Sequence, residues 1–248
     1  MLVYGRNVAK ELLENEKNIK NIYLQEKFNE KDIISLINSR NLKYKTLSKA
    51  EMQRKTNGNH QGIILEIEDF QYKSLESIYN LDSSLVVILD HLEDPHNFGA
   101  IIRTCEAASV DAIIIPEDRS VSVNSTVFHT SAGTTEKVNI IKVTNIAQTL
   151  RELKKYNYWI VATDMNGTDY RKIDYNGKTA IIIGNEGKGI SDVVRKNSDF
   201  IASIPMKGSV NSLNASVAAG IIIFEALNVR GWLIWNMLII MITNYYNI

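Results

Sequence analysis

Residues 85–99 read LVVILDHLEDPHNFG. This segment opens with the apolar run Leu85–Leu89 and then turns through a proline and a glycine into a helical pattern at Ala100–Ser109. An apolar run without polar alternation is typical of a strand buried on both faces, as in a parallel sheet covered by helices. Similar runs follow at Ala112–Ile115, Trp159–Ala162, Ala180–Ile183 and Ile201–Ile204, with a helical pattern at Ile146–Tyr156. We therefore predict a doubly wound α/β domain over residues 84–230.

A smaller α/β unit is predicted for residues 1–68. Short helical and extended patterns alternate there: helices at Asn7–Leu13 and Glu30–Ser39, strands at Ile19–Leu24, Lys43–Leu47 and Ile63–Ile67, with a turn signal at 57–59 before the last strand. The polar, weakly periodic residues 69–83 are interpreted as a linker.

The bulk composition bounds the function only loosely. The chain has 248 residues, of which 45% are hydrophobic and 23% charged, as in soluble globular proteins. Its single cysteine, Cys105, cannot form an intrachain disulfide, and residues 1–10 lack the pattern of a secretory signal, so we expect a cytoplasmic protein. The net charge is zero and gives no hint of a nucleic-acid partner, although residues 1–68 carry 12 Lys and Arg against 9 Asp and Glu.

Three segments carry residues that could take part in binding or catalysis, and the first, Asp90–Thr104, follows the run Leu85–Leu89. Asn97 is a natural N-cap candidate for the next helix, where Ile101, Cys105 and Ala108 form one apolar stripe and Cys105 is interpreted as a core residue. Arg103 points to the opposite side, in company with Gly99 and Ala107. Such a face has room for a phosphate or for another subunit's backbone, although a solvated surface arginine would show the same pattern.

The second segment, Gly184–Gly189, directly follows an apolar run. Its three glycines, Gly184, Gly187 and Gly189, let a backbone approach a ligand closely, and a plain glycine-rich turn with an exposed Glu186 is the alternative. It is not an ATPase phosphate loop, because Ile190 stands where lysine is required, and the chain has no dinucleotide-binding G-x-G-x-x-G after a strand.

The third segment, residues 204–216, leads into an apolar helix at Val217–Leu227. Ser212 and Asn214 lie at the start of this helix, where free backbone N–H groups favour anions and polar ligand atoms. As helix caps alone, these two residues need no functional explanation.

In their order and spacing, the three segments closely resemble the signature motifs of the SpoU family of RNA ribose methyltransferases, part of the SPOUT superfamily. The resemblance covers residues 1–230, because Tyr4–Asn7 and Asn59–Gly62 are similar to the start and end of the family's N-terminal substrate-binding domain. The chain most resembles the enzymes that methylate a guanosine ribose in large-subunit ribosomal RNA.

The resemblance implies a parallel sheet with a deep C-terminal trefoil knot and a homodimer that packs near the first motif and the last helix. The implied cofactor is S-adenosylmethionine, contacted largely through backbone groups, with no metal. The site residues that the resemblance implies are Thr163, Gly184, Ile204, Met206 and Leu213 for the cofactor, Asn97, Arg103, Glu186, Ser212 and Asn214 for catalysis, and Arg6, His60 and Gln61 for RNA. His60 is equally well explained as a turn residue.

The role of Arg103 is a separate hypothesis. A guanidinium has a pKa above about 12 and resists deprotonation, which argues against Arg103 as the general base. We expect it to grip the phosphate next to the target and to stabilise negative charge on the ribose oxygen, with Asn97 and Glu186 orienting it.

Two functional alternatives stay open at this stage: a transfer RNA ribose methyltransferase, and a non-catalytic RNA-binding or ribosome-assembly protein. The intact Asn97, Arg103 and Glu186 argue against the second. Residues 231–248 form an apolar tail beyond the usual end of the family, too short and interrupted for a membrane span of about 20 residues. An idiosyncratic extension packed on the dimer and a membrane-surface anchor are both compatible with it.

Overall fold

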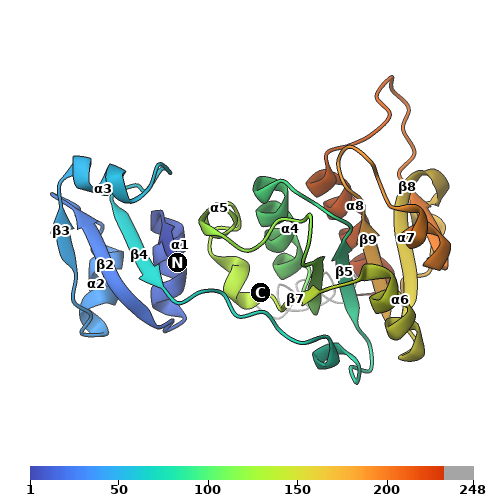
Figure 1. Ribbon diagram of the computed structural model, residues 1–248, viewed down its shortest axis with the longest axis horizontal. Helices are drawn as coiled ribbons and strands as arrows, with labels where there is room; N and C mark the ends of the chain where they lie inside the picture. The colour runs from blue at the N-terminus through green and yellow to red at the C-terminus, as the bar shows by residue number, and fades with distance from the viewer. Residues whose placement is uncertain (232–248) are drawn as a thin grey trace, which may run out of the picture. The chain divides into compact units, whose positions relative to one another are not determined.

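The structure, a computed structural model, describes residues 1–231 (Figure 1). These residues form two compact units. The first contains Met1–Gln71, Asp94–Arg103 and Ser122–Lys137, and the second contains Tyr72–Glu93, Thr104–Val121 and the chain from Val138 onward.

The first unit is built on a four-stranded sheet with the order β1-β4-β2-β3. Its strands are β1 (Leu2–Tyr4), β2 (Ile19–Gln25), β3 (Lys45–Leu47) and β4 (Ile63–Ile67), and its helices are α1 (Arg6–Glu14), α2 (Lys31–Ser39), α3 (Lys49–Lys55), α5 (Ser125–Thr130) and the short η2 (Thr134–Lys137). Helices cover both sheet faces, because Ile22 and Leu24 of β2 share a core with α1 and α2, whereas Tyr23 packs against Met52 of α3. The N-terminal α/β prediction is confirmed in its helices and strands, and β1 and α3 are additions to it.

The second unit is built on a six-stranded sheet with the order β10-β8-β9-β5-β6-β7, in which every pairing is parallel. Its strands are β5 (Leu85–Leu89), β6 (Ala112–Pro116), β7 (Ile140–Val143), β8 (Trp159–Asp169), β9 (Thr179–Ile183) and β10 (Phe200–Ser203). Its helices are α6 (Ile146–Lys155), α7 (Asp192–Asn197), α8 (Ala215–Val229) and the short η1 (Leu75–Ile78) and η3 (Tyr170–Lys172), while α4 (Pro95–Ala107) has residues in both units.

Both faces of the parallel sheet are buried. Val86 and Ile88 of β5 share a core with Leu150 of α6 and Val194 of α7. The alternate side chains of the strands point to the other face, where α8 contacts β9. This confirms the α/β fold and explains why the strands appear in the sequence as unbroken apolar runs. The trefoil knot stays a prediction.

Two expectations from the sequence are wrong. Asn97 is not an N-cap, because α4 begins at Pro95 and the side chain of Asp94 accepts a hydrogen bond from the backbone N–H of His96 (2.9 Å). Proline suits the first helical position, where its missing N–H costs no bond. The linker prediction for 69–83 extends too far, because residues from Tyr72 belong to the second unit and Ile78 is buried in its core.

The described chain ends at Gly231, so the expected tail at 231–248 otherwise lies outside the described residues. Within residues 1–231, no helix has the length and apolar character needed to cross a membrane.

Arg230 ends α8 and joins it to the amino edge of the parallel sheet. Its Nε donates to the carbonyl oxygen of Tyr175 (2.9 Å), and its Nη2 donates to those of Ser84 (2.9 Å) and Gly177. Since a charged donor strengthens a hydrogen bond, this side chain holds α8 against the segments that precede β5 and β9.

We expect Arg230→Met to destabilise the protein by about 2–4 kcal/mol, because three carbonyl groups lose their charged donor while the aliphatic packing is kept. Chemical unfolding of both proteins measures this difference. The control is Arg151→Met, an exposed arginine on α6; equal stability of the Arg230 and Arg151 variants would show that the three bonds contribute nothing.

Candidate functional site

A pocket of about 800 Å³ lies at the carboxyl edge of the parallel sheet, where open α/β sheets bind their ligands. The segments that line it follow or end β8, β9 and β10 and begin α8. All five residues predicted to contact a cofactor line this pocket: Thr163, Gly184, Ile204, Met206 and Leu213. Glu186 and Ser212, two of the predicted catalytic residues, line it as well.

The glycine-rich loop after β9 folds back on itself. The N–H of Asn185 donates to the carbonyl of Gly189 (3.0 Å), and the N–H of Gly189 donates back to Asn185 (2.9 Å). A Cβ on Gly184 would lie 2.4 Å from the carbonyl carbon of Gly189 and 2.7 Å from the nitrogen of Ile190. Because these are backbone atoms, only glycine fits at position 184.

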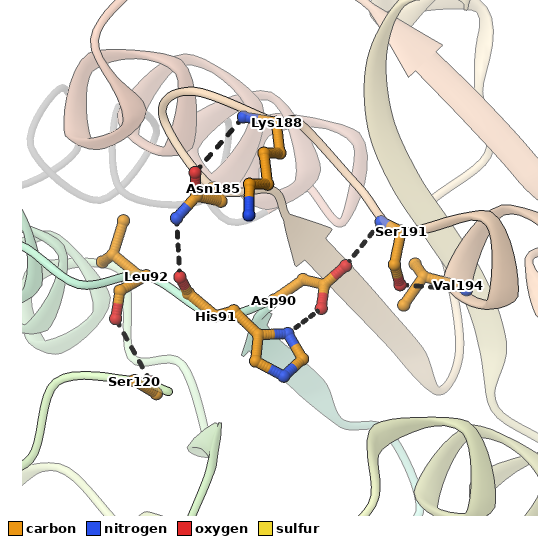
Figure 2. A network of polar contacts seen from close by, with 8 residues as sticks. All are labelled: Asp90, His91, Leu92, Ser120, Asn185, Lys188, Ser191 and Val194. Atoms are coloured by element: carbon orange, nitrogen blue, oxygen red, sulfur yellow. Dashed lines mark hydrogen bonds and ion pairs between the residues drawn. The ribbon is translucent and has the colours of Figure 1, made fainter. Parts of the chain in front are cut away.

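Both ends of this loop are tied to the end of β5 (Figure 2). At the loop's start, the side-chain amide of Asn185 donates to the carbonyl of His91 (2.8 Å), and its oxygen accepts from the N–H groups of Gly187 (2.9 Å) and Lys188 (3.2 Å). At the loop's end, the buried carboxylate of Asp90 accepts from the N–H of Ser191 (2.8 Å). The residues after β5 therefore act as a clamp on the pocket's main loop.

The clamp includes a contact between the two neighbouring side chains at the end of β5. Asp90 Oδ1 lies 2.7 Å from Nδ1 of His91, whose backbone has the left-handed φ of 60°. This conformation is uncommon for a residue with a Cβ and turns the chain sharply after the strand. Sequence reasoning missed Asp90, His91 and Asn185 as site residues; a polar pair directly after a buried strand was the available signal.

We expect Asn185→Ala to weaken S-adenosylmethionine binding by about 10-fold or more, because three hydrogen bonds that shape the loop are lost together. Isothermal titration calorimetry measures this affinity. Asn176→Ala is the matched control, since its side-chain amide donates to Asp174 within the turn before β9 and lies outside the pocket lining. An Asn185 variant that binds as tightly as the control would show that the clamp is dispensable.

The start of α8 gives Asn214 a structural role. Its side-chain oxygen accepts from the N–H groups of Ser216 (3.0 Å) and Val217 (3.4 Å), so Asn214 is the N-cap of the helix. This confirms the expected helix start. Ser212, two residues earlier, reaches the pocket lining.

Asn97 and Arg103 lie on α4, in the first unit. Arg103 is exposed, as is Ala107 one turn later, whereas Asn97 is buried. Gly99 departs from the expected open face: a Cβ there would lie 2.6 Å from Cβ of Thr130 on α5, so this part of the face is covered. Cys105 is fully buried, burial raises the pKa of its thiol, and the core interpretation is confirmed. The grouping of Arg103 and Asn97 with Glu186 stays a prediction.

Arg6, His60 and Gln61, the predicted RNA contacts, line one pocket of about 790 Å³ in the first unit. Gln61 organises it: its side-chain oxygen accepts from the N–H of Arg6 (2.9 Å), and its carbonyl accepts from the guanidinium (3.3 Å). The guanidinium also pairs with Glu30 (2.7 Å). His60 accepts the N–H of Gly62 at Nδ1 (3.0 Å) and is thus also a turn residue.

Two family models, both of RNA methyltransferases, match this chain, one in each part of the sequence. Residues 84–224 match the model of the SpoU rRNA Methylase family, and residues 2–73 match the model named RNA 2′-O ribose methyltransferase substrate binding. A Staphylococcus saprophyticus protein assigned to the TrmH family of tRNA/rRNA methyltransferases is 37% identical over 242 residues, covering 94% of this chain and 97% of its own.

Two solved structures add a structural comparison. The AdoMet-bound rRNA methyltransferase of Sinorhizobium meliloti has a TM-score of 0.76 and 26% identity, with 91% of this chain and 85% of that chain covered. The TrmH/SpoU tRNA modifying enzyme of A. aeolicus has a TM-score of 0.55 and 36% identity, with 59% of this chain and 75% of that chain covered.

Proposed function

Because the chain belongs to the SpoU family of RNA methylases, we propose that it transfers a methyl group from S-adenosylmethionine to the 2′-oxygen of a guanosine ribose in large-subunit ribosomal RNA. The observation that carries the proposal is the pocket at the carboxyl edge of the parallel sheet. It gathers every residue that the family resemblance implies for the cofactor, although these residues come from three separate segments of the chain, at Thr163, at Gly184 and at 204–213.

The lining of this pocket fits S-adenosylmethionine. Gly184 lines the pocket without a side chain, the side chains of Ile204, Met206 and Leu213 supply apolar surface, and Glu186 supplies a carboxylate. Adenine and ribose need such apolar walls with a few polar groups, and a cationic sulfur favours a nearby carboxylate. When bound, the cofactor supplies an electrophilic methyl group; no dinucleotide fingerprint is required for this mode of binding.

The remaining chemistry falls to side chains that hold the RNA. The proposed role of Arg103 is to bind the phosphate beside the target ribose and to stabilise negative charge on the 2′-oxygen. Asn97 and Glu186 are proposed to orient its guanidinium, and Ser212 and Asn214 to supply polar groups at the pocket's edge. Holding the reacting atoms in line supplies much of the rate in such a transfer.

The share of this chain that each solved structure covers favours ribosomal RNA over transfer RNA as the substrate. The Sinorhizobium meliloti rRNA enzyme covers 91% of this chain, whereas the A. aeolicus tRNA modifying enzyme covers 59%. Residues 2–73 match the substrate-binding model, and we propose that this part of the chain selects the RNA substrate. Transfer RNA is the second candidate, since the curated relatives carry both substrates in their names.

The experiment is transfer of labelled methyl from S-adenosylmethionine to unmodified large-subunit ribosomal RNA and to unmodified transfer RNA, with the product mapped by resistance to alkaline hydrolysis. A single protected ribose in ribosomal RNA is the expected result. Label in transfer RNA alone would overturn the proposed substrate, and cofactor binding without label in either RNA would support the non-catalytic alternative.

We also propose that the enzyme is a homodimer that pairs through α8. Val217 and Phe224, seven positions apart on one face of this helix, have exposed fractions of 51% and 41%. Phe224→Glu is expected to shift the protein to the monomer in light scattering after gel filtration, because a charge would be buried at the contact. Phe224→Leu is the control. A dimeric Phe224→Glu protein, or a monomeric wild type, would rule out this interface.

A further inference from the structure

The topology of the first sheet brings four loops to one edge. Because β4 is antiparallel to β1 and β2, while β2 is parallel to β3, the carboxyl ends of β1, β2 and β3 lie at the same edge as the amino end of β4. The chain segments at these ends are the ones that line the pocket of about 790 Å³. A site assembled from the segments after the carboxyl ends of three strands and before the amino end of a fourth is a typical place for a ligand.

An aromatic ring forms part of this pocket. Phe28 ends the turn after β2, and its ring lies on the backbone of Gly62, where a Cβ would come within 2.8 Å of Cδ2. Gly62 has a φ of 88°, so glycine is required there for both conformation and space. Phe28 is half-buried, with one part packed on the core of the first unit and the rest in the pocket lining. Such a ring is a stacking platform for an unpaired base.

Three cationic side chains line the same pocket, and two of them are lysines. Lys27 and Lys49 are exposed, and within residues 1–231 neither ammonium is recorded in an ion pair. The third cation, Arg6, is held by Glu30 and Gln61. Lysines without a carboxylate partner are available to a phosphate, which an RNA strand presents at every nucleotide.

His60 adds a fixed hydrogen-bond donor. Burial and the nearby Lys49 lower the pKa of His60 below its usual value, so the ring is neutral at neutral pH. Since Nδ1 accepts the N–H of Gly62, the ring hydrogen stands on Nε2, which can donate to an oxygen or ring nitrogen of a base.

We propose that this pocket holds one unpaired nucleotide of the RNA substrate, with its base against Phe28 and His60 and its phosphate at Lys27 and Lys49. The inference rests on the proposed function and specifies what the first unit recognises: a nucleotide turned out of a loop or bulge, not the shape of a regular duplex. The groups gathered here match that ligand, since they combine a π-face, a directional donor and free positive charge.

The test measures binding of the full-length protein to a fluorescein-labelled RNA hairpin with an unpaired loop and to a fully paired duplex of equal length, over a range of salt concentrations. Phe28→Leu keeps the packing on the core but removes the aromatic face, and it is expected to weaken hairpin binding by about 10-fold at every salt concentration. Lys27→Gln and Lys49→Gln are each expected to lower the slope of log affinity against log salt by about 1.

The control is Lys20→Gln, the same charge change on an exposed lysine at the amino end of β2, the opposite edge of the sheet. It is expected to bind hairpin RNA like the wild type. Thermal unfolding of each variant separates loss of binding from loss of fold, and the two exposed pocket lysines keep the test decisive if Phe28→Leu is unstable.

Hairpin binding that is unchanged in all three pocket variants, or a wild type that prefers the duplex, would overturn the pocket proposal while leaving methyl transfer intact. A wild-type protein that neither binds nor methylates RNA would overturn the proposed function as well. Binding of GMP to the same proteins is measured in parallel. Variants that lose GMP binding but keep hairpin binding would make this a mononucleotide site and would contradict the proposal.

Discussion

Replacing Arg103 with alanine is expected to lower the rate of methyl transfer by about 100-fold or more while S-adenosylmethionine binding stays at the wild-type level. The arginine is exposed on α4, beside Ile102 and Cys105, which are buried, so its removal leaves the packing of that helix unchanged. A planar guanidinium binds a phosphate and a developing oxyanion through parallel N–H groups, which no other side chain reproduces. Single-turnover methylation of the RNA substrate measures the rate, and calorimetry measures cofactor binding.

Two further variants sharpen the result. Arg103→Lys keeps the charge but loses the paired donors and is expected to recover only a small part of the rate. Arg151→Ala, on the exposed face of α6, is the matched control and should be fully active. Near-normal activity of Arg103→Lys would refute paired donation, and near-normal activity of Arg103→Ala would remove this residue from the reaction.

Gly184→Ala is expected to abolish measurable S-adenosylmethionine binding, a loss of about 100-fold or more. The added Cβ would stand 2.4 Å from the carbonyl carbon of Gly189, so the loop has to open. Opening breaks the paired backbone bonds between Asn185 and Gly189 and displaces part of the pocket wall. Because the obstructing atoms are backbone, a change of rotamer cannot relieve the contact.

The same loop supplies the control for this prediction. A Cβ on Gly187 would meet only the side-chain oxygen of Asn185, at 3.6 Å, so Gly187→Ala should bind the cofactor nearly as the wild type does. Calorimetric titration of both variants, with thermal unfolding to confirm their fold, separates the two cases. Equal affinities would mean that the loop is not the rigid wall described here.

Strands buried on both faces could be predicted from the sequence, because their apolar runs do not depend on which neighbour they pair with. The edge strand β7 was missed, since it is short and contains Lys142, whose ammonium lies 4.8 Å from the ring of Tyr72. The six-residue helix α7 was missed because so short a segment carries too little periodicity. Asn97 was misplaced because Pro95 and Asp94 offer an equally good helix start one turn earlier.

For the pocket, the sequence motifs supplied the residues that line it but not those that hold it in shape. The bond from Asn185 to His91 spans 94 positions and the bond to Asp90 from Ser191 spans 101. One partner in each is a backbone group, which leaves no mark in the sequence. The three predicted RNA contacts line one pocket, whereas the position of Phe28 beside Gly62 depends on the pairing of β2 with β4 and could not be predicted.

The bond from Arg230 to Ser84 spans 146 positions, so it can form only after nearly all of the second unit has been synthesised. The chain emerges from its amino end, so β5 is made early and pairs with β9 only after more than half of the domain has followed. Ala218 and Ile222 of α8, which line the pocket at the carboxyl edge of the sheet, are the last of its lining residues to be made. A nascent or prematurely terminated chain therefore lacks a finished pocket at the carboxyl edge of the sheet, and this pocket is complete only after synthesis has passed α8.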